Sequence, residues 1–194
     1  MRFFVTGEQN RQQLLNTIVL LFMIYMMVLW LSNGLMYFHK MSLNADSVIE
    51  YYLGSEAKFT EPRSYQSLLE VSHAHVFSMG MLAVTLTHLL LFAAVQPWLK
   101  IGLSGLIYLA AIGDEAAGWL VRFVHPQFAY LKIGLFLTLE LSLGAMIVLV
   151  ALSLWRQRSE MKQAGSQRQA HRARLQAESA RHKAKVSRPP AARD

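Results

Sequence analysis

Long runs of apolar residues without charge alternate with short polar connections along the first 155 residues of the chain. A helix crosses the hydrocarbon core of a bilayer with about 20 apolar residues. The pattern therefore predicts four membrane spans, at about 13–38, 72–95, 101–122 and 129–155. The first run is too long for the core of a signal peptide and lacks a small-residue cleavage site, so we expect it to be retained. These features predict an all-α integral membrane four-helix bundle over residues 1–155.

The connections between the predicted spans differ in length. The connections at 97–100 and 122–127 are short, whereas the segment 39–70 is long enough to fold. Asn44 or Ser42 can cap a short helix there, and Gly54 can end it. The segment Ser67–Glu70 matches a capping box, which predicts that the second helix begins a turn or two before the membrane.

Charge is concentrated at the C-terminal end. Residues 156–194 carry eleven Lys or Arg against three acids, whereas residues 1–155 carry eight basic and nine acidic side chains. We expect this basic tail to be helical as far as about Val186, or else disordered, and to lie on anionic lipid. It has neither interleaved aromatic residues nor a recognisable module, so nucleic-acid binding is not expected.

The distribution of Lys and Arg also predicts the orientation. Basic segments next to spans are retained in the cytoplasm, so the tail should be cytoplasmic. An even number of spans places the N-terminus on the same side. The loop 39–70, with three basic and five acidic residues, then faces outward. We expect a multi-pass protein of the cell inner (plasma) membrane with both termini in the cytoplasm.

Histidines in and near the spans are the first candidates for chemistry, because ionisable residues in a membrane are costly and mark functional sites. His39, His73, His75 and His125 all fall towards the predicted outer side, and His88 lies deeper in the second span. His73 and His75 are about 200° apart on a helix, so they cannot both face one ligand. The sequence does not show which of the two faces the bundle.

These histidines suggest b-type haem, which needs two axial ligands from facing helices and a small residue, such as Gly80, where the ring lies against a helix. His73 and His88 would stand about 22 Å apart along that helix. The pattern resembles small four-helix b-type cytochrome-like subunits of bacterial inner membranes, and it rests on His39, His73, His75, His88 and His125. The resemblance implies electron transfer with a quinone or a redox partner protein. The chain departs from that family at His88, because no other span has a second histidine near the cytoplasmic side that could serve as the other axial ligand. The haem expected is therefore a single one in the outer leaflet, held by His73 or His75 together with His39 or His125.

Acidic residues form a second constellation. Asp114 and Glu115 interrupt the third span and should meet His73 or His75 at similar depth, while Glu140, the acid of the fourth span, lies deeper. A carboxylate beside a histidine can orient a ligand or relay protons. Imidazole also suits copper and zinc, so a metal-binding or transport protein that uses His73, His75, Asp114 and Glu115 is an alternative.

The remaining alternative is a non-catalytic membrane subunit that docks a partner through the outer loop or the tail. The chain has no cysteine, which excludes thiolate metal sites, iron–sulfur clusters and covalently attached haem. It also lacks a nucleophile elbow, a phosphate loop, a dinucleotide fingerprint and an HExxH motif. Catalytic turnover by this chain alone is therefore not expected. If the chain takes part in an oxidoreductase, we expect it to be the membrane anchor or the electron relay.

Overall fold

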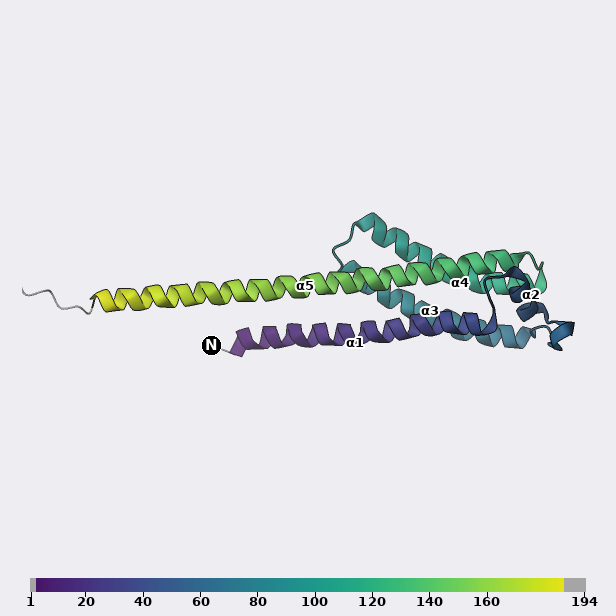
Figure 1. Ribbon diagram of the computed structural model, residues 1–194, viewed down its shortest axis with the longest axis horizontal. Helices are drawn as coiled ribbons and strands as arrows, with labels where there is room; N and C mark the ends of the chain where they lie inside the picture. Colours follow the sequence, from purple (N-terminus) through teal and green to yellow (C-terminus); the bar gives the residue numbers. More distant parts are fainter. Residues whose placement is uncertain (1–2, 187–194) are drawn as a thin grey trace, which may run out of the picture. The chain divides into compact units, whose positions relative to one another are not determined.

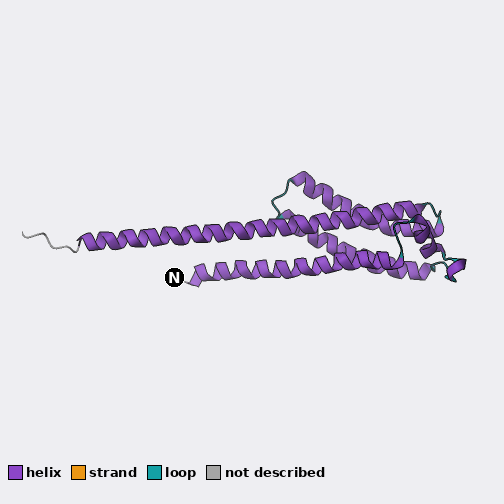
Figure 2. Cartoon of the chain, in the orientation of Figure 1, coloured by secondary structure: helices purple, strands orange, loops and turns teal. Residues whose placement is uncertain are grey.

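The computed structural model describes residues 3–186 and is helical over most of that range, as Figures 1 and 2 show. The elements are α1 (Phe3–Lys40), α2 (Ala45–Leu53), the 3-10 turn η1 (Glu56–Lys58), α3 (Tyr65–Leu91), α4 (Pro97–Phe123) and α5 (Phe128–Val186). The predicted all-α fold class is confirmed. The chain divides into two compact units, residues 1–153 and 154–194, and the boundary falls within α5.

Three helices have the length and composition of membrane spans: Leu14–Lys40 in α1, Tyr65–Leu91 in α3, and Phe128–Arg156 in α5. The fourth predicted span corresponds to α4, which at 27 residues is as long as α3. Its composition is less apolar because it contains Lys100, Asp114, Glu115 and Arg122. Three of the four predicted spans are therefore supported by length and composition, and α4 packs against α3.

Two helix boundaries differ from the sequence prediction. Ser64, rather than Ser67, caps α3: its Oγ accepts a hydrogen bond from the backbone N of Ser67 at 3.1 Å. The helix thus begins one turn earlier than the capping-box pattern indicated. In the next connection α3 ends at Leu91 and α4 begins directly at Pro97. Proline is well suited to the first position of a helix, because its fixed φ matches and the N–H it lacks would be unpaired there.

The short helix predicted in the first loop is present as α2. The side chain of Asn44 accepts from Asp46 N, and Gly54 terminates the helix with φ 80°, a backbone conformation that favours glycine. This helix covers one end of the first unit, which we call the α2 end. The C-termini of α1 and α4 and the N-termini of α3 and α5 meet there.

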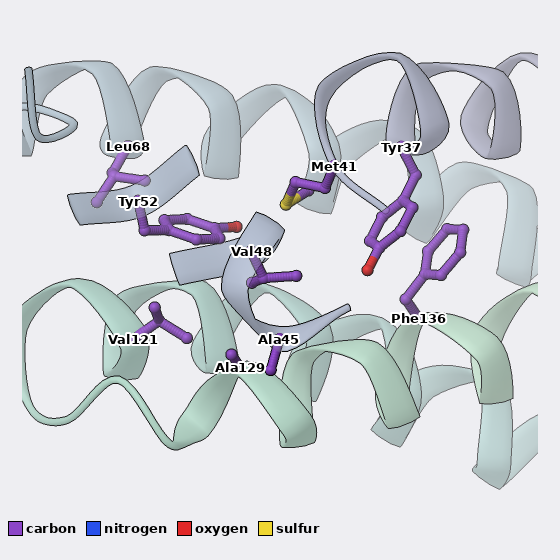
Figure 3. Packing of buried hydrophobic residues seen from close by; sticks show 9 residues of the cluster. All are labelled: Tyr37, Met41, Ala45, Val48, Tyr52, Leu68, Val121, Ala129 and Phe136. Atoms are coloured by element: carbon purple, nitrogen blue, oxygen red, sulfur yellow. The ribbon is translucent and has the colours of Figure 1, made fainter. Parts of the chain in front are cut away.

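The α2 end has its own hydrophobic cluster, shown in Figure 3. Val48 and Ala45 of α2 pack with Val121 of α4 and Ala129 of α5. Tyr37 of α1 stacks on Phe136 of α5, with ring centroids 3.6 Å apart and planes 8° from parallel. The cluster also contains Met41, Tyr52 and Leu68. The cluster joins α2 to all four long helices. The segment between α1 and α3 is therefore folded, and it covers the α2 end.

The second unit begins at Leu154 and is helical as far as Val186. The predicted basic tail therefore contains a long helical part. The eleven basic residues counted in 156–194 include two, Arg188 and Arg193, that lie outside the described residues.

Candidate functional site

A buried ion pair lies beneath the hydrophobic cluster of the α2 end. Lys132 Nζ donates to Asp114 Oδ2 at 2.8 Å and to the backbone oxygen of Asp114 at 3.0 Å. The two side chains are only 6% and 4% exposed. The pair joins the middle of α4 to the first turns of α5. Because a single buried charge is very costly, each partner neutralises the other.

Glu115, the next residue on α4, faces a different set of groups. Its Oε2 accepts a hydrogen bond from Ser72 Oγ on α3 at 2.7 Å, and the same hydroxyl accepts from Trp119 Nε1 at 2.9 Å. Its Oε1 lies 3.7 Å from Nε2 of His75. The polar network therefore connects α3 to α4 on the face of α3 that packs against α4.

The ligating atoms of His75, Asp114 and Glu115 come close together. One atom from each residue lies within 4.8 Å of the others. Two buried polar atoms there, His75 Nε2 and Asp114 Oδ1, have no hydrogen-bond partner among the described residues. Native proteins rarely leave buried polar atoms unpaired, so these two atoms are candidates for a hydrogen bond to water or to another small partner.

A cavity of about 80 Å³ adjoins these residues. An engineered apolar cavity that binds benzene has a volume of about 150 Å³. This cavity therefore admits a few water molecules or a small ion, and it is too small for the ring of a quinone or of a haem. Its lining continues from Asp114 and Lys132 to the exposed Lys40 and the half-buried Arg63, which gives it a route to the surface at the α2 end.

The spacing of the ligating atoms distinguishes two kinds of occupant. A tetrahedral zinc ion with bonds of about 2.0–2.1 Å holds neighbouring ligand atoms roughly 3.4 Å apart. A water molecule that hydrogen-bonds to two groups at about 2.8 Å each spans roughly 4.5 Å. Here His75 Nε2 and Glu115 Oε1 are 3.7 Å apart, and the ligating atoms of the three residues all lie within 4.8 Å of one another. They fit bridging water better than a directly coordinated metal, and Lys132 already supplies a cation.

Tyr52 of α2 covers the cavity at the α2 end. Its ring is 6% exposed, and its hydroxyl points at the backbone of α4: a Cβ added to Gly118 would lie 2.5 Å from the Tyr52 oxygen. Burial raises the pKa of Tyr52 to about 12, and the nearby ammonium of Lys132 opposes that rise. Glycine at position 118 is therefore what allows the cover to approach so closely.

The other predicted histidine ligands are not brought to this cluster. His39, His73, His88 and His125 are exposed, and of the five candidates only His75 is half-buried. The ring of His88 packs edge-on against Phe92, and His125 Nδ1 accepts from Gln127 N at 3.2 Å. A Cβ added to Gly80 would meet no atom within 4 Å, so this glycine is not a point of close helix packing.

The structure settles which of the paired histidines faces the bundle. His75 shares its face of α3 with Ser72 and the buried Met79 and Leu86, whereas His73 points away. The predicted meeting of a span-two histidine with the acids of span three is confirmed for His75. It is not found for His73.

Lys132 was missed in the sequence prediction, which considered only Glu140 as a charged residue of the fourth span. The signal was present, because Lys132 is the only Lys or Arg between Phe128 and Trp155. Two adjacent acids in one span and a single base in the following span suggest that these charges pair between the two helices.

Long apolar helices with charges paired in their interior define an integral membrane protein of the helical class. The chain belongs to a family described as a transmembrane helical domain, whose model matches residues 42–161. The matched segment includes α2, α3 and α4 and the first part of α5, and it therefore contains His75, Asp114, Glu115 and Lys132. Comparisons with curated proteins and with solved structures gave no match.

Proposed function

We propose that this membrane protein exchanges protons at the α2 end, with His75 as the group that takes a proton from water and Glu115 as its partner. The observation that carries the proposal is the pair of unpartnered buried atoms, His75 Nε2 and Asp114 Oδ1, beside a cavity of water-molecule size. Chains of His, Asp and Glu within membrane spans commonly relay protons.

The charge balance of the cluster supports this role. With a neutral His75, the two carboxylates and the Lys132 ammonium leave one net negative charge in a half-buried site. One proton, bound to His75 or Glu115, makes the cluster neutral. In the proposed exchange this proton lies between His75 Nε2 and Glu115 Oε1, which are 3.7 Å apart.

The proposal includes α4 as a fourth span. At 1.5 Å per residue its 27 residues extend about 40 Å, enough to cross the hydrocarbon core. The charged side chains of α4 near its two ends bond to backbone: Lys100 Nζ donates to Leu91 O, and Arg122 Nε donates to Arg63 O. Its central acids are held by Lys132, Ser72 and His75. Each charged side chain of α4 therefore has a polar partner, which is what a charged residue in a membrane-spanning helix requires.

The orientation proposed from the basic tail puts the α2 end on the outer side of the cell inner membrane. The loop that carries α2 would then be extracellular or periplasmic, and the cavity would open to outer water through the region of Lys40 and Arg63. In this arrangement His75 is positioned to exchange protons with the outer aqueous phase.

The test is pH-difference infrared spectroscopy of the full-length protein in lipid nanodiscs, with isotope-labelled histidine. The expected result is a His75 signal and a Glu115 carboxylate signal that change at the same pH, because the two groups share one proton. Glu115→Gln should abolish the carboxylate change and leave His75 to titrate alone. Glu70→Gln, an exposed acid on α3, is the matched control and should alter neither signal. Independent titration of the two groups in the wild type would refute the proposal.

The same preparation tests the other hypotheses. A reduced-minus-oxidised absorbance spectrum tests for b-type haem, which would have to bind outside the cavity, for example on the exposed face of α3 that carries His73 and Gly80. Metal analysis tests for copper or zinc. Stoichiometric metal that is lost in both Asp114→Asn and Glu115→Gln would replace proton exchange with metal binding, and a haem spectrum lost in His73→Ala would favour the electron carrier.

A further inference from the structure

Helix α1 is attached to α5 along a short seam centred on Glu140. Trp30 Nε1 donates to the backbone oxygen of Glu140 at 3.0 Å, and Asn33 Nδ2 donates to Glu140 Oε1 at 2.5 Å. One turn closer to the α2 end, Tyr37 stacks on Phe136. Glu140 thus accepts two hydrogen bonds from α1, one through its backbone and one through its carboxyl group.

Glycines on both helices allow this close approach. A Cβ added to Gly144 of α5 would lie 3.0 Å from the ring of Trp30, and one added to Gly34 of α1 would lie 3.8 Å from Glu140 Oε2. Small residues at such interfaces are typical of helix packing in membranes, where close contact and hydrogen bonds replace the hydrophobic effect as the driving force. Elsewhere on α1 few side chains are buried, Met23 and Met26 among them, and only 11% of the apolar 18-residue window in its span is buried. The seam therefore supplies the hydrogen bonds by which α1 is attached to α5.

The position of Glu140 makes a charge there costly. It lies eight residues beyond Lys132, or about 12 Å further along α5, and twelve residues from the start of that helix, or about 18 Å. It forms no ion pair among the described residues. The carboxylate of Asp114 acts on Glu140 unfavourably, and that carboxylate is already paired with Lys132.

We propose that Glu140 is a second proton-binding site, separate from the cluster at His75, and that the proton it holds keeps α1 docked on α5. A neutral carboxyl group can accept from Asn33 and rest against Gly34 at moderate cost in hydrocarbon. A carboxylate at that depth would have one amide donor and no counter-ion, and it would be driven towards water at the expense of the seam. Loss of the proton therefore releases α1.

Two measurements on the full-length protein in nanodiscs test this inference. Infrared spectroscopy detects the carbonyl stretch of a protonated carboxylic acid, which Glu140→Gln should remove and Glu70→Gln should not. The absence of cysteine allows spin labels to be placed specifically at Leu21→Cys on α1 and Val148→Cys on α5, both exposed positions. Their distance distribution is then measured as a function of pH.

The expected result is a narrow distribution that broadens, in the wild type, at the pH where the carboxylic acid band disappears. In Glu140→Gln, which is permanently neutral, the distribution should stay narrow at every pH. Asn33→Leu, which keeps the carboxyl group, should broaden the distribution already at neutral pH, and it serves as the test if Glu140→Gln does not fold. An acid band that survives Glu140→Gln, or a wild-type distance that does not respond when the band is lost, would overturn the inference. The infrared measurements are made in a Glu115→Gln background, so the acid band cannot come from Glu115 and neither outcome depends on whether His75 and Glu115 exchange protons.

Discussion

Replacing Lys132 by Met should be the most damaging single change in the first unit. The substitution keeps an unbranched side chain of similar length but removes the ammonium group that lies 2.8 Å from Asp114 Oδ2. At that distance two unit charges attract by about 6 kcal/mol in a medium with an effective dielectric constant of about 20. Desolvation offsets part of that energy. Removing one partner, however, leaves Asp114 charged and buried, which typically costs about 3–5 kcal/mol. The adjacent Glu115 adds repulsion.

The assay is the free energy of unfolding in mixed lipid–detergent micelles, followed by fluorescence of the four tryptophans while a denaturing detergent is added. Asp114→Asn combined with Lys132→Met removes both charges and should recover most of the loss, so that the double-mutant cycle gives a large coupling energy. Lys58→Met is the control, because the Lys58–Glu50 pair is exposed at the surface and contributes little. A loss below about 1 kcal/mol for Lys132→Met, or a double variant as unstable as the sum of the single ones, would refute the reasoning.

Three further predictions concern the cover of the site. The pKa of Tyr52 is raised from 10.0 to about 12, so above pH 10 the unfolded chain loses this proton before the folded one does and stability falls. The loss should be about 2.3 kcal/mol at pH 12, approach about 2.7 kcal/mol only at higher pH, and be absent in Tyr52→Phe, as measured by unfolding at a series of pH values. Gly118→Ala places its Cβ 2.5 Å from the Tyr52 oxygen and should cost about 1–3 kcal/mol. Tyr52→Phe should relieve only part of this cost, because the ring carbon Cζ stays at 2.9 Å; full relief would contradict the geometry. Gly54→Ala combines φ +80° with a contact of 2.4 Å to Thr60 O, and it should speed hydrogen exchange over residues 55–60 while leaving exchange in α3 and α5 unchanged.

Much of the fold was predictable because its signals are local. Asn44 and Gly54 bound α2 as their side-chain chemistry predicts, and the apolar runs correspond to the long helices. That one of the two histidines of α3 would meet Asp114 or Glu115 was also predictable, since it follows from similar depth on adjacent spans.

The remaining features depend on contacts between distant segments. Which of His73 and His75 faces inward is set by the rotation of α3 against α4, and a symmetric pattern of histidines does not encode that rotation. The partnership of Lys132 with Asp114 joins residues 18 positions apart across a turn. The seam at Glu140 joins it to Asn33, 107 positions away. Neither the packing angle nor the register of two helices can be read from one helix alone.

The ion pair between α4 and α5 also has a consequence for biosynthesis. A charged residue at the centre of a helix raises the free energy of insertion by about 2.5–3.5 kcal/mol. With Asp114 and Glu115 side by side, α4 is the helix that fails the composition of a span, and the base that compensates Asp114 follows α4 in the chain and leaves the ribosome after it. We therefore expect α4 to wait at the insertion machinery and to enter the bilayer together with α5, as a hairpin. A chain truncated before Lys132 should leave α4 outside the membrane, which a glycosylation-mapping assay of nascent chains would detect.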